Sequence, residues 1–165
     1  MILPKLVLLA GLGIALDLNG QPQSLSQQPI PADTLITLRR SNCFYTYSDY
    51  VVTVSADGTV NYEGYANVRV KGKAQTKISR EKIQALIAAF GKAKYFSLRD
   101  SYSSFEDCRI SNADAPSATT SIRINGKLKS IYHYLGCRPK RGSVRALIKL
   151  ENEIDELAGI DQWVN

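Results

Sequence analysis

The chain has 165 residues, a formal net charge of +6 and hydrophobic residues at 44% of its positions. This length is sufficient for one domain with a hydrophobic core of its own. The single histidine excludes a metal site built on several histidines. No zinc-ligand spacing, RNA-binding signature or helix-turn-helix pattern favours a nucleic acid as partner.

The first twenty residues have the character of a secretory signal. Lys5 provides a short positive start, and Leu6–Leu16 form an apolar run with small residues such as Gly13 and Ala15. A membrane span needs roughly 20 residues, so this run is too short to cross a bilayer. We predict a signal peptide at residues 1–20 and a secreted or periplasmic protein without a transmembrane span. The alternative is a buried or uncleaved amphipathic segment.

A polar tether is predicted to follow this leader. Residues 21–33 are rich in Gln, Pro and Ser and contain little that could be buried. The folded unit is therefore expected to be one domain at residues 34–165. The leader contains one Lys and one Asp, so its removal leaves the net charge unchanged. Outside the cytoplasm, a basic surface favours an anionic partner: an envelope polymer, lipid head groups or an acidic protein.

Three strands are predicted at the start of the domain. The first is residues 34–40, a short segment rich in β-branched residues, and residues 50–65 supply the other two as a hairpin. Residues 67–73 continue the alternation, with Val68 and Val70 directed inward. Clean alternation is typical of an antiparallel sheet that has one solvated face.

The first hairpin turns around Gly58, and its register follows from the apolar pattern. A three-residue loop pairs Val54 with Val60 and Val52 with Tyr62, whereas a two-residue loop would oppose valines to polar residues. The three-residue loop is preferred because it places the apolar side chains on one face, with Gly58 in the left-handed conformation of a bulge.

A helix is predicted to cover the other face of this sheet. Ser79 is a favourable N-cap. A long polar loop at residues 97–116 follows, and loops of this length are either functional or held in place by another part of the structure. The apolar stripe of the helix consists of Ile83, Leu86, Ile87 and Phe90.

A second hairpin and a last helix complete the domain. Residues 117–135 turn at Asn125-Gly126, but two- and three-residue loops both leave mismatches, so the pattern does not decide the register. Ser143 is predicted to cap the last helix and Gly159 to close it, and Trp163 is expected to pack on the core. The stripe of this helix consists of Leu147, Leu150, Ile154 and Leu157.

The order β-β-β-α-β-β-α predicts an α+β fold. We expect an antiparallel sheet of about five strands, with two helices packed on one face.

Several segments together resemble a bacterial family known as domain of unknown function 6438. The resemblance covers Leu35 to Trp163 and depends on the order and spacing of the segments. It implies a secreted or envelope-associated domain and assigns no activity. The segments are residues 41–50, DGTVNYEG, ISREKIQALIAAF, NADAPS, YHYLGC and the final LENEID with its following Trp.

The chain departs from the opening motif of the family, which resembles C-F-G-x-C-P-x-Y. Tyr45 stands in place of the glycine, Tyr47 in place of the second cysteine and Ser48 in place of the proline. Whatever the cysteine pair does in relatives, this chain cannot do it in the same way. The positions that match family motifs, without an assigned role, include Cys43, Tyr50, Asp114, Pro116 and His133.

The chain has three cysteines, and this odd number leaves one thiol unpaired if a disulfide forms. Folding of the second hairpin brings Cys137 near residues 114–115, and the segment back to Cys108 can bend to meet it. We predict a Cys108–Cys137 disulfide. Cys43 is then a free thiol, in a monomer or in a dimer linked through Cys43. The alternative is three buried free thiols.

No catalytic constellation is predicted. Nothing in the sequence brings Cys43 and His133 together, so a Cys–His enzyme is not favoured. His133 is predicted to be a hydrogen-bonded strand residue at the sheet surface, and Asp114 to close a turn before a strand. The acidic residues of the 97–116 loop match no calcium-binding or glycosidase pattern; they are Asp100, Glu106, Asp107 and Asp114.

A basic cluster near the start of the last helix is a candidate anion site, because free N–H groups also point outward there. The alternative is a solvated basic loop. The candidate residues are Arg138, Lys140, Arg141 and Arg145.

Together these features favour a secreted or periplasmic module, without catalytic activity, metal or cofactor, that binds an anionic envelope component or a protein partner. The alternative is an envelope hydrolase that uses carboxylates of the 97–116 loop.

Overall fold

The computed structural model describes residues 29–43, 47–103, 108–110, 114–139 and 142–165, without the side chains of residues 108–110, 138–139 and 143. Four strands come first: β1 (Leu35–Ser41), β2 (Asp49–Ser55), β3 (Thr59–Ala66) and β4 (Gly72–Lys77). The helix α1 (Arg80–Lys92) and the short 3-10 helix η2 (Tyr95–Ser97) follow. The rest of the chain forms β5 (Ser101–Tyr102), β6 (Cys108–Ile110), β7 (Ser117–Ile124), β8 (Lys127–Tyr134), β9 (Cys137–Pro139), α2 (Gly142–Ala158) and α3 (Asp161–Val164).

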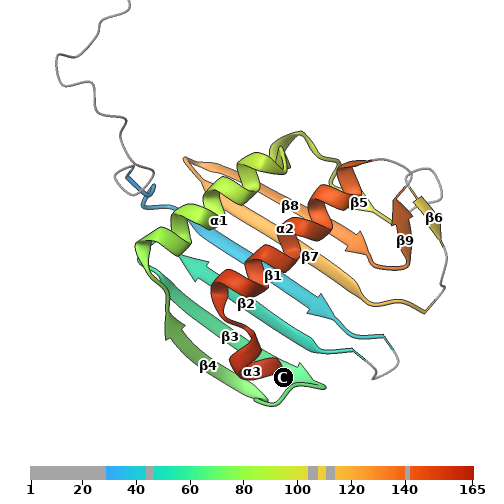
Figure 1. Ribbon diagram of the computed structural model, residues 1–165, viewed down its shortest axis with the longest axis horizontal. Helices are drawn as coiled ribbons and strands as arrows, with labels where there is room; N and C mark the ends of the chain where they lie inside the picture. The colour runs from blue at the N-terminus through green and yellow to red at the C-terminus, as the bar shows by residue number, and fades with distance from the viewer. Residues whose placement is uncertain (1–28, 44–46, 104–107, 111–113, 140–141) are drawn as a thin grey trace, which may run out of the picture.

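The described strands form one seven-stranded sheet and one two-stranded sheet. The large sheet has the order β4-β3-β2-β1-β7-β8-β5, and β6 pairs with β9. All pairs are antiparallel except β5 with β8, which is parallel. Figure 1 shows α1 and α2 crossing the same face of the large sheet. The predicted α+β fold with helices on one face is confirmed, but the sheet is larger than predicted and partly parallel.

The 97–116 segment contains two strands that were predicted as loop. β5 has only two residues, Ser101 and Tyr102, which pair with Tyr132 and His133 of β8. Two residues cannot show an alternation of apolar and polar side chains, so this long-range pairing leaves no local signal.

The predicted register of the first hairpin is confirmed. Val54 pairs with Val60 and Val52 with Tyr62. Gly58 has a φ of 85°, the left-handed conformation expected for the bulge position.

The predicted strand at residues 67–73 is wrong, because β4 begins only at Gly72. Asn67 has a φ of 51°, which ends the extended backbone. The N–H groups of Arg69 and Val70 then donate to the carbonyls of Val164 and Trp163, at 3.4 and 2.9 Å, instead of to a strand. This segment therefore attaches the C-terminal end of the chain to the sheet.

The second hairpin has a two-residue loop, a register that the sequence left open. Ile124 pairs with Lys127. Asn125 and Gly126 both have positive φ, 51° and 71°, as a type I′ turn requires. The carboxylate of Asp33 accepts hydrogen bonds from both of their N–H groups, at 2.9 and 2.6 Å. The residue predicted to end the tether thus supports this turn.

Of the two predicted N-cap residues, Ser79 and Ser143, only Ser79 directly precedes its helix. The side chain of Ser79 accepts a hydrogen bond from the N–H of Lys82 at 3.4 Å, so the predicted N-cap of α1 is confirmed. α2 begins at Gly142, so Ser143 lies inside the helix and the predicted cap is wrong.

The predicted end of α2 at Gly159 and the predicted packing of Trp163 on the core are both confirmed. Gly159, after α2, has a φ of 71°. Trp163 is 7% exposed, and its ring stacks on Tyr62 with a centroid distance of 4.8 Å.

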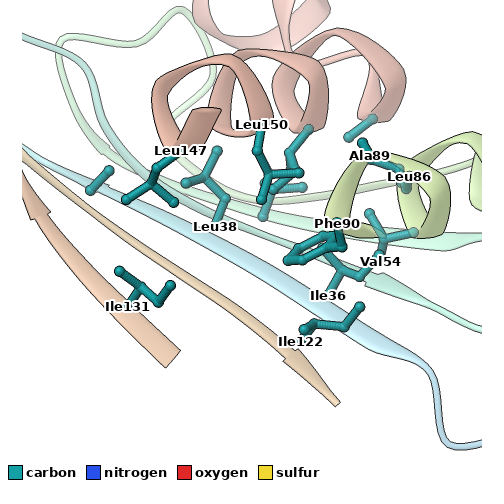
Figure 2. Close-up of a cluster of buried hydrophobic side chains, with 14 of the residues drawn as sticks. Ile36, Leu38, Val54, Leu86, Ala89, Phe90, Ile122, Ile131, Leu147 and Leu150 are labelled. Atoms are coloured by element: carbon teal, nitrogen blue, oxygen red, sulfur yellow. The ribbon is translucent and has the colours of Figure 1, made fainter. Parts of the chain in front are cut away.

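The core lies between the two helices and one face of the sheet. Figure 2 shows Leu86, Ala89 and Phe90 of α1 and Leu147 and Leu150 of α2 directed toward strand side chains such as Ile36, Leu38, Val54, Ile122 and Ile131. Each of these side chains is at most 4% exposed. Full burial of a leucine- or phenylalanine-sized side chain contributes about 1.5–3 kcal/mol, so this layer supplies most of the stability. In the described part of the chain, no helix has the length and apolar character needed to cross a membrane.

We expect Gly58→Ala to destabilise the domain by at least about 1 kcal/mol more than Gly126→Ala. Both glycines have positive φ, and an alanine there costs about 1–2 kcal/mol from the backbone alone. At Gly58 an added Cβ would also lie 2.4 Å from the carbonyl oxygen of Ile78, whereas at Gly126 it meets nothing within 4 Å. Urea unfolding of the two variants measures the difference; equal losses would show that the close approach at Gly58 relaxes freely.

Candidate functional site

The sheet face opposite α1 and α2 is not covered by any helix or strand of the described part of the chain. Its side chains alternate with the buried ones and are half-buried or exposed. We call this surface the open face. A central row crosses it, one residue from each of six adjacent strands, and consists of Gln75, Asn61, Thr53, Thr37, Ser121 and Ser130.

The central row contains only uncharged polar side chains. Strands lie about 4.8 Å apart, so the row extends over five spacings, or about 24 Å. In the row, the Nε2 of Gln75 donates to the Oδ1 of Asn61 at 2.8 Å. Hydroxyl and amide groups can both donate and accept, so the row presents hydrogen-bonding groups at regular intervals across the sheet.

Basic side chains flank the central row on both sides. Lys77 and Arg123 lie two residues from it in one direction, and Lys73 and Arg39 in the other. Glu63 is the one acidic residue in these two flanking rows. The open face therefore has two basic side chains on each side of a neutral polar strip.

Arg39, on the central strand β1, is oriented by contacts with Asp49 and Tyr65. Its Nη2 lies 2.7 Å from the Oδ1 of Asp49, and its guanidinium carbon lies 4.4 Å from the ring centroid of Tyr65. Lys77 lies 3.8 Å from Asp57 at the turn of the first hairpin. These carboxylates orient two of the basic side chains.

The open face is hollowed above β2, β3 and β4. The hollow has a volume of about 590 Å³. Sheet twist produces such concavity without any special residue. Its polar lining includes Thr53, Asn61, Glu63, Lys73 and Gln75.

The covered face contains a second group of polar side chains. The Nδ1 of His133, in β8, lies 3.1 Å from both carboxylate oxygens of Glu151, in α2, and each side chain is 1% exposed. The Nε2 of His133 has no partner in the described part of the chain. A carboxylate on Nδ1 resembles the orienting pair of a general base. Here the pair is sealed in the core, so it acts as a structural link between α2 and the sheet.

The predicted location of His133 at the sheet surface is therefore wrong. β8 does contain the residue, and it is hydrogen-bonded as expected. The pairing of Ala118 with His133 places it on the covered face, next to buried Ile131 in the same alternation. The two-residue turn sets this register, which the sequence could not decide.

A third polar cluster joins α2 to the carboxyl end of β1. The Nε and Nη2 of Arg40 donate to the Oδ2 of Asp155 at 2.8 and 2.7 Å, and the hydroxyl of Tyr50 donates to its Oδ1 at 2.7 Å. Nη2 of Arg40 also donates to Asn152 at 3.3 Å. The cluster borders a hollow of about 310 Å³ near the C-terminal residues.

Burial governs the titration of this cluster. It raises the pKa of the Asp155 carboxyl above its usual value of 3.8, although the nearby Arg40 charge opposes the rise. Burial, with the charge of Asp155, likewise raises the pKa of Tyr50. For Arg40, burial lowers the pKa but the attraction of Asp155 outweighs it, so the net change is upward.

The positions that match the family motifs divide between core and surface. Tyr50 and His133 are buried members of the two clusters above. Asp114 is exposed, and Pro116 directly precedes β7, where its carbonyl accepts from the N–H of Leu135 at 2.9 Å. Cys43 is a half-buried free thiol. The structure does not bring these residues together into one site.

The other sequence candidates are mostly separate from one another. Asp100 is 82% exposed, and its carboxylate lies 2.6 Å from the Nζ of Lys129. Arg145 is exposed on α2. Glu106, Asp107, Lys140, Arg141 and the side chain of Arg138 lie outside the described residues. Within the described part, no group of three His, Cys, Asp or Glu side chains could hold a metal ion.

The strands that contain Cys108 and Cys137 are paired. β6 and β9 are antiparallel, with Cys108 opposite Pro139 and Ile110 opposite Cys137. The backbone thus brings the two segments side by side, and the side chain of Cys137 is 3% exposed. The disulfide itself remains a prediction.

Sequence reasoning missed the open face as a surface. Part of the signal was present, because outward positions of the predicted strands include Thr37, Thr53, Asn61 and Ser121. Recognising the row required the order and register of all six strands, which no single segment determines.

We expect Arg40→Met to lower the free energy of unfolding by about 2–4 kcal/mol at pH 7, because it leaves the Asp155 carboxylate buried without its cation. A raised folded-state pKa means that the contribution of Asp155 is complete below its unfolded value and is lost as pH rises through the folded value. Removal of Arg40 raises that pKa further. The loss should therefore shrink between pH 7 and pH 4.5, as measured by urea unfolding.

Arg39→Met is the matched comparison on the neighbouring residue, because Asp49 and Asp155 are similarly exposed, at 19% and 21%. It should cost less than Arg40→Met, because Arg39 makes one contact with its carboxylate whereas Arg40 makes two. An Arg40→Met loss of the same size at both pH values would contradict the role given to Asp155.

We expect one free thiol per chain when the unreduced protein is unfolded and alkylated, and three after reduction. The Cys108–Cys137 bridge would close a loop of about 30 residues and stabilise the fold by about 3–4 kcal/mol in the chain-entropy model. Intact mass measures the number of alkylated thiols. Three alkylated thiols without reduction would show that no bridge exists.

Comparison with known proteins agrees with the sequence resemblance. No curated protein matches the chain. A family model described as Domain of unknown function (DUF6438) matches residues 34–158, from the start of β1 to the end of α2. The match spans the sheet, both long helices and the buried clusters. The chain belongs to this family of unknown function.

Proposed function

We propose that the chain is a secreted or periplasmic module, without catalytic activity, that binds an anionic polymer of the cell envelope across its open face. The observation that carries the proposal is the central row, a strip of neutral hydrogen-bonding side chains with two basic side chains on each side of it. A linear polymer with hydroxyl groups and regularly spaced negative charges complements this arrangement.

The basic side chains supply attraction and the central row supplies contact. The four basic side chains Lys73, Lys77, Arg39 and Arg123 exceed the nearby carboxylates by one charge, since Glu63, Asp49 and Asp57 lie beside three of them. This excess, together with the net charge of +6, favours the approach of a polyanion. Each exposed charge contributes little alone, and the attraction is screened by salt. An extended ligand can use many such contacts at once, which makes a polymer a better partner than a small anion.

The leader supports the envelope as the location. Residues 1–20 combine a positive start with a short apolar run, as an export signal does. The predicted disulfide agrees with this location, because disulfides persist in oxidising compartments.

Binding of polygalacturonate, a linear polyanion, tests the proposal by titration calorimetry at low and high salt. The double variant Lys73→Glu/Lys77→Glu should weaken binding at least about tenfold. The double reversal Lys82→Glu/Lys92→Glu is the control, because both of its lysines are exposed on α1 and face away from the open face. It changes the net charge equally and should have a much smaller effect.

A second variant tests the central row without changing charge. Thr37→Val/Thr53→Val keeps the β-branched shape of two adjacent row members and removes their hydroxyl groups. Loss of these hydrogen bonds should weaken binding by about threefold to tenfold. If wild-type protein does not retain the polymer at low salt, the proposal fails. Shortening of the polymer during incubation would instead favour the alternative hydrolase.

A further inference from the structure

A second hollow lies on the helix side of the molecule, apart from the open face. It has a volume of about 330 Å³, within the range of small-molecule sites. It opens between the end of α1, η2 and β7, and its lining is apolar except for one lysine and one serine. We call it the α1–β7 groove; the residues that matter here are Phe90, Gly91, Lys94, Phe96, Ile122 and Ile124.

The apolar wall of the groove is part of the buried core. Phe90 and Ile122 belong to the core and are 3% and 1% exposed, and Figure 2 shows both in the layer between helix and sheet. Phe96, by contrast, is 45% exposed at the edge of the groove. A large aromatic side chain left in water beside an apolar hollow is the kind of surface that a hydrophobic ligand covers.

Gly91 keeps the groove open. It lies in the last turn of α1, where glycine is among the least favourable residues for a helix. A Cβ added there would meet nothing within 4 Å, so packing does not require glycine at this position. The missing side chain leaves space at the rim that almost any other residue would fill.

Lys94 places a positive charge at the same rim. Its φ is 50°, a left-handed conformation that is unfavourable for lysine and that glycine or asparagine would adopt more easily. The side chain is exposed, and no ion pair of Lys94 occurs in the described part of the chain. An unneutralised ammonium therefore stands beside an apolar hollow.

We propose that the α1–β7 groove binds a medium-chain fatty acid such as dodecanoate. Its alkyl chain would lie against Phe90, Ile122 and Ile124 and cover Phe96, and its carboxylate would pair with the ammonium of Lys94. An apolar hollow with one cation at its mouth complements an apolar chain with one anionic end. This site is independent of the polymer-binding face, so either proposal can fail without the other.

Titration calorimetry of the full chain with dodecanoate, below its micelle concentration, tests the proposal. Wild-type protein should bind one dodecanoate per chain. Gly91→Leu places a bulky side chain at the rim, where an added Cβ meets nothing within 4 Å, and should abolish measurable binding. Lys92→Leu places the same side chain one residue further along, outside the groove, and should bind as wild type does.

The role of the charge is tested separately. Lys94→Gly removes the ammonium and relieves the backbone, so it should raise the melting temperature while weakening dodecanoate binding about tenfold or more. Dodecyl maltoside, with the same chain and no charge, should bind wild-type protein correspondingly weakly. Absence of saturable dodecanoate binding, unchanged binding in Gly91→Leu, or equal affinity for the uncharged detergent would overturn the proposal.

Discussion

The structure depends on the burial of one face, and only one face, of a seven-stranded sheet in which six adjacent strands are antiparallel. Because successive side chains of a strand point to opposite faces, each register decides which residues enter the core. The first hairpin sends Val52 and Val54 inward, and the pairing of β1 with β7 aligns Ile36 with Ile122 on the same side. α1 and α2 complete this buried layer. The residues that the same registers direct away from the core make up the open face.

α2 also brings two carboxylates, Glu151 and Asp155, into the buried layer, and each of them has a partner on the sheet. Glu151 and Asp155 are one helical turn apart, and the sheet supplies His133 to one and Arg40 with Tyr50 to the other. Buried ionic groups contribute little net stability compared with apolar residues of similar size. Their directional bonds do restrict how α2 can slide or rotate on the sheet. We infer that these two contacts fix the position of the helix, whereas leucines such as Leu147 and Leu150 supply the energy.

Local signals were sufficient for much of the fold but not for its long-range pairings. The valine and tyrosine pattern determined the first hairpin, and Ser79 and Gly159 marked helix ends correctly. In the second hairpin, Lys129 and His133 share the inward face with Ile131, so the apolar pattern contradicted the true register. β5 and the turn at Asn67 depend on partners far along the chain, Tyr132 and Trp163 among them. For the same reason the open face, which combines six strands, was not visible from any one segment.

Protection of the sheet edge explains two of the four basic residues of the open face without a ligand. β4 is an edge strand, and lysines on an exposed edge prevent pairing with another chain. Lys73 and Lys77 satisfy that need. Arg39 and Arg123 lie in β1 and β7, which are paired on both sides, so edge protection gives no reason for a cation there. Central strands usually favour β-branched or aromatic residues at such positions. Arg39 has a reason within the fold, because it pairs with Asp49 and lies over the ring of Tyr65. Arg123 is exposed, and neither edge protection nor packing accounts for its charge, so it is the basic residue of the open face that most favours the proposed ligand.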